Sequence, residues 1–270
     1  MRGVSRSSFT GLREWLAEAV RGSVVADMLG DELFAVLRLL DREHGLRRAL
    51  SEPARPAGQK AEAVGALLHG RISPDAEDLV VAAVTARWAS PADLSDAIEQ
   101  LAIETSVMAA EFDGQLDDLE DELFRFGRIV AAQPELRAAL SGTSVPEERK
   151  RGLLEALLAG KVTPVTLRLV TEMAVHPRGR AVQASLELCA RIAARRRERL
   201  IAVVRVAAAL TAAQRDRLAA ALSRAYGHDV YLNVVLDPAV IGGMTVQIGD
   251  ELIDGSLSSR LAAVRRRLAG

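Results

Sequence analysis

The residue types that most often carry out catalysis are few in this sequence and lie far apart. The four histidines are His44, His69, His176 and His228, and none belongs to a His-Glu-x-x-His pair that could hold zinc. The sequence also lacks the Gly-x-Ser-x-Gly turn of a serine nucleophile and the Gly-x-x-x-x-Gly-Lys-Ser/Thr loop that cradles phosphate. Isolated histidines are usually surface or packing residues. We therefore predict no catalytic residue, no cofactor-binding residue and no metal ligand.

The single cysteine and the most acidic segment support the same prediction. Cys189 has no second cysteine with which to form a disulfide or a metal cage, and its apolar neighbours on a predicted helix favour a buried packing role. Seven carboxylates lie between Glu111 and Glu122, but they lack the ligand offsets of a calcium-binding loop. We interpret this run as the solvated face of a helix that begins after Gly114.

Charge and hydropathy exclude two further classes of protein. Lysine and arginine total 35 and aspartate and glutamate total 36, so the net charge of −1 does not supply the basic surface of a general nucleic-acid binder. The longest segment without a charged residue or histidine is Pro238–Gly249, which is shorter than the about 20 residues of a membrane helix. The first residues lack the apolar core of a secretory signal. We expect a cytosolic globular protein that does not insert into a membrane.

An internal duplication with an offset of 90 residues organises most of the chain. The segment LGDELF at Leu29–Phe34 aligns with LEDELF at Leu119–Phe124, and the alignment continues without a gap. It gives 20 identities over the 52 positions from Leu29 to Val80. Chance would give only a few identities, so the two copies are expected to share one fold.

Each copy predicts the same series of amphipathic helices. In the first copy, apolar residues recur at helical spacing over residues 31–42, 46–50 and 61–68. Two further helices are expected to begin at Ser73-Pro74 and Ser90-Pro91, with serine as N-cap and proline at the first helical position. The second copy carries Thr163-Pro164 at the equivalent start. The expected domains are helical bundles at residues 1–110 and 111–199.

The last 71 residues follow a different pattern and predict a small α/β module at residues 200–270. Strands are expected at 200–206, 229–236, 244–248 and 252–253, the last two joined by a Gly249-Asp250 hairpin. A helix is expected after the Thr211–Gln214 capping box, and another over residues 257–268. We expect the sheet to be antiparallel. The predicted fold class is therefore mainly α, with a duplicated helical bundle followed by a small α/β module that contains an antiparallel hairpin.

One segment of this module resembles a known family. Residues 232–261 read LNVVLDPAVIGGMTVQIGDELIDGSLSSRL and are similar to the C-terminal signature of the delta subunit of bacterial F-type ATP synthase. The mitochondrial counterpart is the oligomycin-sensitivity-conferring protein. The matching pieces are Asp237, Ile241-Gly242-Gly243, Ile248-Gly249-Asp250, Ile253-Asp254-Gly255-Ser256 and Arg260-Leu261. The resemblance extends from about Gln115 to the end, and the first helical copy departs from the usual pattern of the family.

The resemblance implies a stator subunit without an active site or cofactor. The helical part of such subunits holds the N-terminal helices of the alpha subunits of the catalytic head. The C-terminal module holds the b subunits of the peripheral stalk. The subunit thereby resists rotor torque during proton-driven ATP synthesis. It would lie at the cytoplasmic face of the cell membrane as a peripheral protein.

The resemblance and the helix order together suggest candidate interface residues. In the family, the first and fifth helices form a groove for the alpha subunit, and the first copy offers eight apolar residues for it: Leu12, Trp15, Leu16, Ala19, Leu79, Val80, Ala83 and Val84. The alternative is that these residues are bundle core. For the stalk, we expect the edge of the hairpin at Met244–Ile253 and four arginines: Arg260, Arg265, Arg266 and Arg267. Such basic runs are otherwise solvated helix faces.

Two other functions stay open from the sequence alone. The chain could be a free helical-repeat adaptor that binds a soluble partner through its C-terminal module. It could also be an enzyme with an unrecognised site, which would require polar groups converging in a pocket. The C-terminal signature favours the stator over the adaptor, and co-purification with ATP synthase subunits would decide between them.

Overall fold

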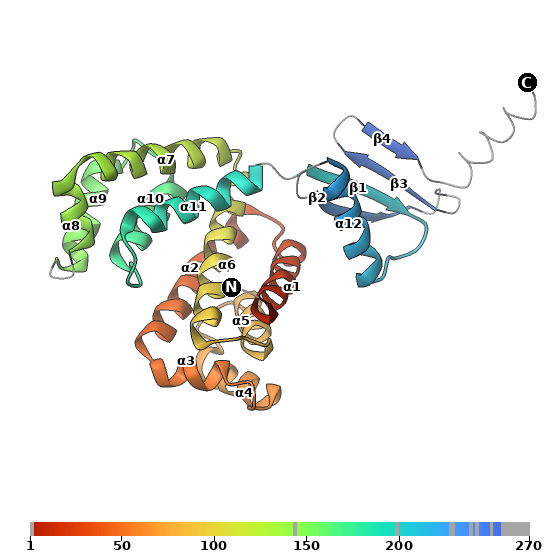
Figure 1. Cartoon of the computed structure of the whole chain (residues 1–270), viewed down its shortest axis with the longest axis horizontal. Coiled ribbons are helices and arrows are strands. Elements are labelled where there is room, and N and C mark those ends of the chain that lie inside the picture. The colour runs from red at the N-terminus through yellow and green to blue at the C-terminus, as the bar shows by residue number, and fades with distance from the viewer. Residues whose placement is uncertain are drawn as a thin grey trace, which may run out of the picture. The chain divides into compact units, whose positions relative to one another are not determined.

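The chain folds into two compact units, residues 1–194 and 195–270, which are described separately (Figure 1). The computed structural model describes residues 3–142, 145–197, 200–226, 230–237, 240, 243–248 and 251–254. The first unit is helical and the second combines a helix with a four-stranded sheet. The predicted class, mainly α with a small α/β module, is confirmed.

The helical unit contains two successive series of helices. The first series is α1 (Val4–Ala19), α2 (Ser23–Arg42), α3 (His44–Ser51), α4 (Ala57–Leu68), α5 (Pro74–Thr85) and α6 (Pro91–Phe112). The second series continues with α7 (Leu116–Ala132), α8 (Pro134–Ser141), α9 (Glu147–Leu158), α10 (Pro164–Val175) and α11 (Val182–Arg197). Helices α8, α9 and α10 begin and end 90 residues after α3, α4 and α5. The structure thus carries the duplication seen in the sequence.

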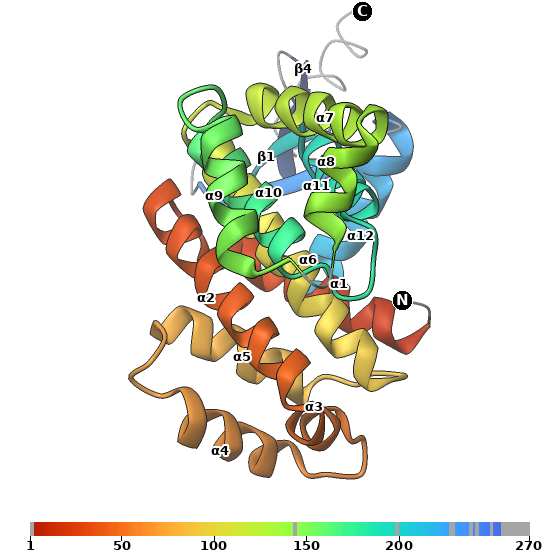
Figure 2. The same ribbon diagram turned by 90° about the vertical axis from the view of Figure 1, so that its left-hand side faces the viewer.

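Helix α6 belongs to both series. At the offset of 90 residues, α1 aligns with residues 94–109 of α6, so α6 takes the place of α1 in the second copy. At the same offset, residues 92–107 of α6 align with α11. Helix α6 contacts α1, α2, α3 and α5 on one side of the duplication and α7 and α10 on the other. Figures 1 and 2 show it passing from one helical set into the other. The predicted boundary at residue 110 therefore falls inside a helix that both copies use.

The N-caps of α5 and α10 repeat one hydrogen-bond arrangement. The Ser73 hydroxyl accepts from the Ala76 amide, and the Thr163 hydroxyl accepts from the Thr166 amide. In each copy a glutamate of the preceding long helix, Glu32 or Glu122, accepts from the amide of the capping residue. The two predicted helix starts are confirmed, and each cap is fixed by a long-range contact within its own bundle.

Helices α2 and α6 pack unusually closely because small residues face each other. Gly30 of α2 lies against α6, where a Cβ atom added to it would stand 3.0 Å from the Ser106 hydroxyl oxygen and 3.5 Å from the Ala102 carbonyl oxygen. Ala26, Ala102 and Ser106 are buried beside it in the same core. The absence of a side chain at Gly30 is therefore what permits this approach.

The C-terminal unit is built on a mixed sheet. Its elements are β1 (Leu200–Val206), α12 (Ala212–Tyr226), β2 (Val230–Leu236), β3 (Met244–Ile248) and β4 (Glu251–Asp254). The strand order is β2-β1-β3-β4, with β1–β3 and β3–β4 antiparallel and β1–β2 parallel. The predicted hairpin is confirmed, whereas the expectation of a wholly antiparallel sheet is wrong. Helix α12 connects β1 to β2 as a crossover, and such a connection makes the two strands parallel.

A small core of its own stabilises the C-terminal unit. Its buried residues come from β1, α12, β2 and β3. They are Ala202, Val204, Val206, Leu222, Val230, Val246 and Ile248. The predicted capping box at the start of α12 is confirmed, since the Gln214 side chain accepts from the Thr211 amide at 2.8 Å and the Thr211 hydroxyl accepts from the Gln214 amide at 3.3 Å. The helix predicted over residues 257–268 lies outside the described residues.

Gly243, just before β3, has a backbone φ of 91°. A β-branched side chain clashes with the backbone in this region, whereas asparagine tolerates positive φ better. We expect Gly243→Val to destabilise the C-terminal unit by about 1–3 kcal/mol and Gly243→Asn to cost less. Hydrogen exchange of the β1 and β3 amides in the full chain would report the difference. Equal protection in the valine and asparagine variants would contradict the prediction.

Candidate partner-binding surfaces

The residues predicted to form a groove on the first copy lie where α1 meets α5. Six of the eight are buried, namely Leu12, Leu16, Leu79, Val80, Ala83 and Val84. Trp15 and Ala19 are half-buried, and Trp15 packs against the core from its edge. The buried six hold the two helices together, so a partner could contact this surface only through its half-buried rim. Phe9 on α1 and Ala82 on α5 are further half-buried apolar residues of these two helices.

Side-chain contacts fix α1 to the rest of the first copy. The Ser5 hydroxyl donates to the Asp93 carboxylate at 2.8 Å and accepts from the Ala89 amide at 2.9 Å. Arg13 of α1 forms an ion pair with Glu104 of α6 at 2.8 Å. Since both contacts reach the segment that ends in α6, α1 is held in a defined position beside α5.

The equivalent surface of the second copy meets helix α2. Its helices are α6 and α10, and α2 of the first copy packs against α6 and forms two ion pairs with α10. Arg38 of α2 forms an ion pair with Glu172 of α10 at 2.7 Å, and Asp27 of α2 pairs with Arg168. In the first copy the positions equivalent to Arg168 and Glu172 are Asp78 and Ala82, and no ion pair joins either of them to another helix in the described part of the helical unit.

Residues far apart in sequence form a charged network between the copies. Glu99 of α6, whose side chain is 2% exposed, accepts from Arg178 at 2.6 Å and also pairs with Arg180. Arg178 further contacts Asp41 at 2.7 Å and Asp96 at 3.2 Å. Burial alone would lower the pKa of Arg178, but the carboxylates of Glu99, Asp41 and Asp96 raise it. The network joins α2, α6 and the α10–α11 connection.

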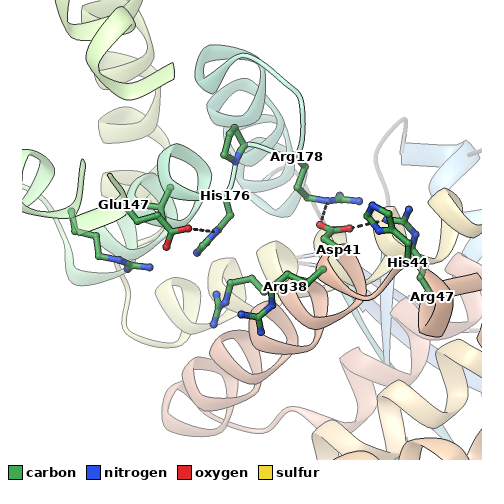
Figure 3. Close-up of a pocket in the computed structure, with 11 residues that line it drawn as sticks. Arg38, Asp41, His44, Arg47, Glu147, His176 and Arg178 are labelled. Carbon is green, nitrogen blue, oxygen red and sulfur yellow. Dashed lines mark hydrogen bonds and ion pairs between the residues drawn. The ribbon is translucent and has the colours of Figure 1, made fainter. Parts of the chain in front are cut away.

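A cavity of about 680 Å³ lies next to this network (Figure 3). Its walls come from α2 and α3 of the first copy and from α9 and the end of α10 in the second copy. The lining residues are Arg38, Asp41, Arg42, His44, Arg47, Glu147, Arg151, Val175, His176, Pro177 and Arg178. The sequence did not predict this cavity, because no local motif connects side chains that lie more than a hundred positions apart.

The remaining reactive groups are placed as packing or surface residues. Cys189 is buried, and burial raises the pKa of its thiol to about 12, which confirms the packing interpretation. His69 is exposed and contacts Glu77 at 3.0 Å. In the described ranges no group of histidine, cysteine, aspartate or glutamate side chains is arranged to hold a metal ion. The acidic run supplies Asp117 and Asp118 to the first turn of α7, where their negative charges interact favourably with the positive end of the helix dipole.

The described part of the C-terminal unit has apolar side chains at both edges of its sheet. Leu252 and Ile253 on β4 are 60% and 43% exposed, and Leu236 on β2 is 61% exposed. The predicted hairpin edge at Met244–Ile253 therefore does present apolar surface. The four arginines predicted for the stalk, Arg260 and Arg265–Arg267, lie outside the described residues.

Within the described residues, no helix is long and apolar enough to cross a membrane.

Residues 106–268 match the family model described as ATP synthase delta (OSCP) subunit. Three curated relatives, each called ATP synthase subunit delta, are similar along their whole length. The protein of Thermobifida fusca is 48% identical over 270 residues and covers 100% of each chain. That of Streptomyces avermitilis is 48% identical, covering 99% of this chain and 98% of its own. That of Acidothermus cellulolyticus is 47% identical and covers 100% of each. The first helical copy is thus present in these relatives.

Proposed function

Since the chain belongs to the ATP synthase delta (OSCP) subunit family, we propose that it fastens the catalytic head of the enzyme to the stalk of b subunits. It is a peripheral-stalk component of ATP synthase and is not itself catalytic. The observation that carries this proposal is the full-length similarity to delta subunits, which includes the second helical copy and the C-terminal unit. This similarity favours the stator over a free adaptor or an enzyme. The corresponding location is the cytoplasmic face of the cell membrane, as a peripheral protein.

The head attachment falls on the first helical copy. An amphipathic helix docks into an apolar groove between two helices. In the second copy the corresponding helices are α6 and α10, and α2 forms the Asp27–Arg168 and Arg38–Glu172 pairs with α10. The first copy has Asp78 and Ala82 where the second has Arg168 and Glu172, so it offers neither partner of those pairs. The lack of these two ion pairs favours the half-buried rim of the α1–α5 surface as the place where the N-terminal helix of an alpha subunit binds.

Ala19→Arg provides a test of this attachment. Ala19 is half-buried on α1, so an arginine there adds bulk and charge to the rim without filling the core. We expect the full-length variant to bind a peptide of the N-terminal helix of the alpha subunit at least about tenfold more weakly, because a charge would be buried against an apolar helix. The measurement is isothermal titration. Ala131→Arg, on an exposed position of α7, is the matched control.

Both variants should keep the circular dichroism of the native chain. Equal affinity of Ala19→Arg and the native chain would exclude the α1–α5 surface. Loss of peptide binding in Ala131→Arg alone would likewise contradict the assignment to the α1–α5 surface.

The stalk attachment falls on the C-terminal unit. Its sheet leaves Leu252 and Ile253 exposed on the edge strand β4. An exposed edge strand with apolar side chains can take up an extended or helical partner segment. The C-terminal end of a b subunit is the partner that we propose for this edge, together with the arginines Arg260 and Arg265–Arg267.

Removing the C-terminal unit should separate the two attachments. A cut after Gly227 would leave β1 without either neighbouring strand, because β1 lies between β2 and β3. The cleaner truncation ends at Arg199. We expect this shortened chain to retain full binding of the alpha-subunit peptide and to lose binding of the C-terminal end of the b stalk, with reconstituted enzyme hydrolysing ATP uncoupled from proton transport. Retention of stalk binding by the truncated chain would refute the assignment.

A further inference from the structure

The cavity between the two helical copies is lined by more positive than negative side chains. Five arginines reach it, together with two histidines, and the carboxylates in its walls are Asp41 and Glu147. Asp41 is already engaged, because it pairs with Arg47 at 3.2 Å and with Arg178 at 2.7 Å. Arg38 pairs with Glu172, and Arg178 also pairs with Glu99 and Asp96, so only the remaining arginines can contribute unpaired charge to this space.

Two of the arginines are available for a ligand. In the described part of the chain, Arg42 of α2 and Arg151 of α9 form no hydrogen bond or ion pair, although both line the cavity. They approach it from different copies. Arg38 is held by Glu172 and points toward the same space (Figure 3). The cavity thus brings guanidinium groups together across the boundary between the copies.

Few apolar residues line the cavity. In the described part of the chain they are Val175 and Pro177, and the other lining residues end in charged or polar groups, of which the arginines and histidines could contact an anion. His176 is half-buried, and burial lowers its pKa although the carboxylates of Glu172 and Glu147 act in the opposite direction; its ring N–H can donate a hydrogen bond. The volume of about 680 Å³ lies within the range of small-molecule sites, roughly 300–1,000 Å³.

We propose that this cavity binds a compact polyphosphate group, with Arg42 and Arg151 as its principal ligands. Planar guanidinium groups bind phosphate oxygens through paired hydrogen bonds, and phosphates carry several charges in a small volume. Such a group can belong to an inorganic polyphosphate or to a nucleotide. The bound anion would contact both helical copies and would hold them together. The proposal does not depend on the attachment to the catalytic head or to the stalk.

The test is a titration of the full-length protein with inorganic tripolyphosphate, followed by calorimetry. We expect saturable binding with one site per chain. Arg42→Ala and Arg151→Ala should each weaken it about tenfold or more, because each removes a charge-assisted hydrogen bond to phosphate. The matched controls are Arg48→Ala on α3 and Arg149→Ala on α9, which remove the same charge from exposed positions on two helices that contribute to the cavity. These controls should bind as the native chain does.

Parallel titrations with ADP and with a hexaglutamate peptide identify the ligand. Equal affinity for ADP and tripolyphosphate shows that the site recognises only the phosphate chain. Tighter binding of ADP shows that the nucleoside also contributes to the affinity. Three results would overturn the proposal. These are absence of saturable binding, equal weakening in all four arginine variants, and tighter binding of the acidic peptide than of tripolyphosphate. None of them bears on the stator function.

Discussion

Gly30→Leu is expected to destabilise the helical unit strongly by forcing two packed helices apart. The ideal Cβ position at Gly30 is 3.0 Å from the Ser106 hydroxyl oxygen, which itself donates to the Ala102 carbonyl at 3.0 Å. A leucine would force α2 of the first copy away from α6, the helix that both copies use. Overpacking of a core costs about 1–3 kcal/mol, and a separation of two helices costs more, so we expect a loss of at least about 3 kcal/mol. Urea unfolding followed by tryptophan fluorescence measures it, because Trp15 and Trp88 both lie in this unit.

The matched control is Gly152→Leu on α9. Gly152 is exposed, and a Cβ atom there would meet nothing within 4 Å. Leucine has a better helix propensity than glycine, so this variant should gain up to about 1 kcal/mol. A Gly30→Leu chain as stable as the control would show that α2 and α6 tolerate a wider separation.

Glu99→Leu is expected to have an effect of similar size for an electrostatic reason. The Glu99 carboxylate is 2% exposed and accepts from both Arg178 and Arg180. Removing one partner of a buried ion pair leaves the other charge uncompensated, which costs about 3–5 kcal/mol. Arg178 keeps Asp41 and Asp96, so the lower end of that range is expected. The free energy of unfolding in urea is the measurement.

An exposed ion pair supplies the comparison for Glu99. Asp121 and Arg125 lie one turn apart on α7, with side chains 50% and 71% exposed. Asp121→Ala should change stability by about 0.5 kcal/mol or less. Replacing Glu99 and Arg178 together by leucine and methionine should recover part of the loss, because apolar residues can substitute for a buried ion pair. No recovery in the double variant, or equal losses for Glu99→Leu and Asp121→Ala, would contradict the proposed role of the network.

Features encoded by neighbouring residues were predictable from the sequence. Ser73-Pro74 and Thr163-Pro164 begin α5 and α10 as expected, because an N-cap and a proline at the first helical position act within one turn. The duplication predicted two equivalent helical series because it is visible as identities at a fixed offset. The hairpin between β3 and β4 follows from its short loop.

Features that depend on distant residues were not predictable. The strand–helix–strand order of β1, α12 and β2 was predicted, but the sequence does not show that β2 lies next to β1, and only neighbouring strands joined by such a crossover pair in parallel. Nor does it show that Glu99 meets Arg178 and Arg180 about 80 positions later. The residues of α1 and α5 proposed as a docking groove are mostly buried, and the groove stays a prediction because a periodic apolar pattern alone does not separate a core from a docking surface.

The sharing of α6 by both helical copies has a mechanical consequence. Two bundles joined by a loop can bend at the loop, since a few residues absorb the rotation. Here 22 residues of continuous helix, about 33 Å in length, run through both bundles, and 14 of them are buried. A load applied at one bundle would be carried along the axis of this helix as tension or compression. The duplication has therefore added a second bundle that is connected to the first through a continuous helix. We expect this helix to resist bending more than a loop between the bundles would.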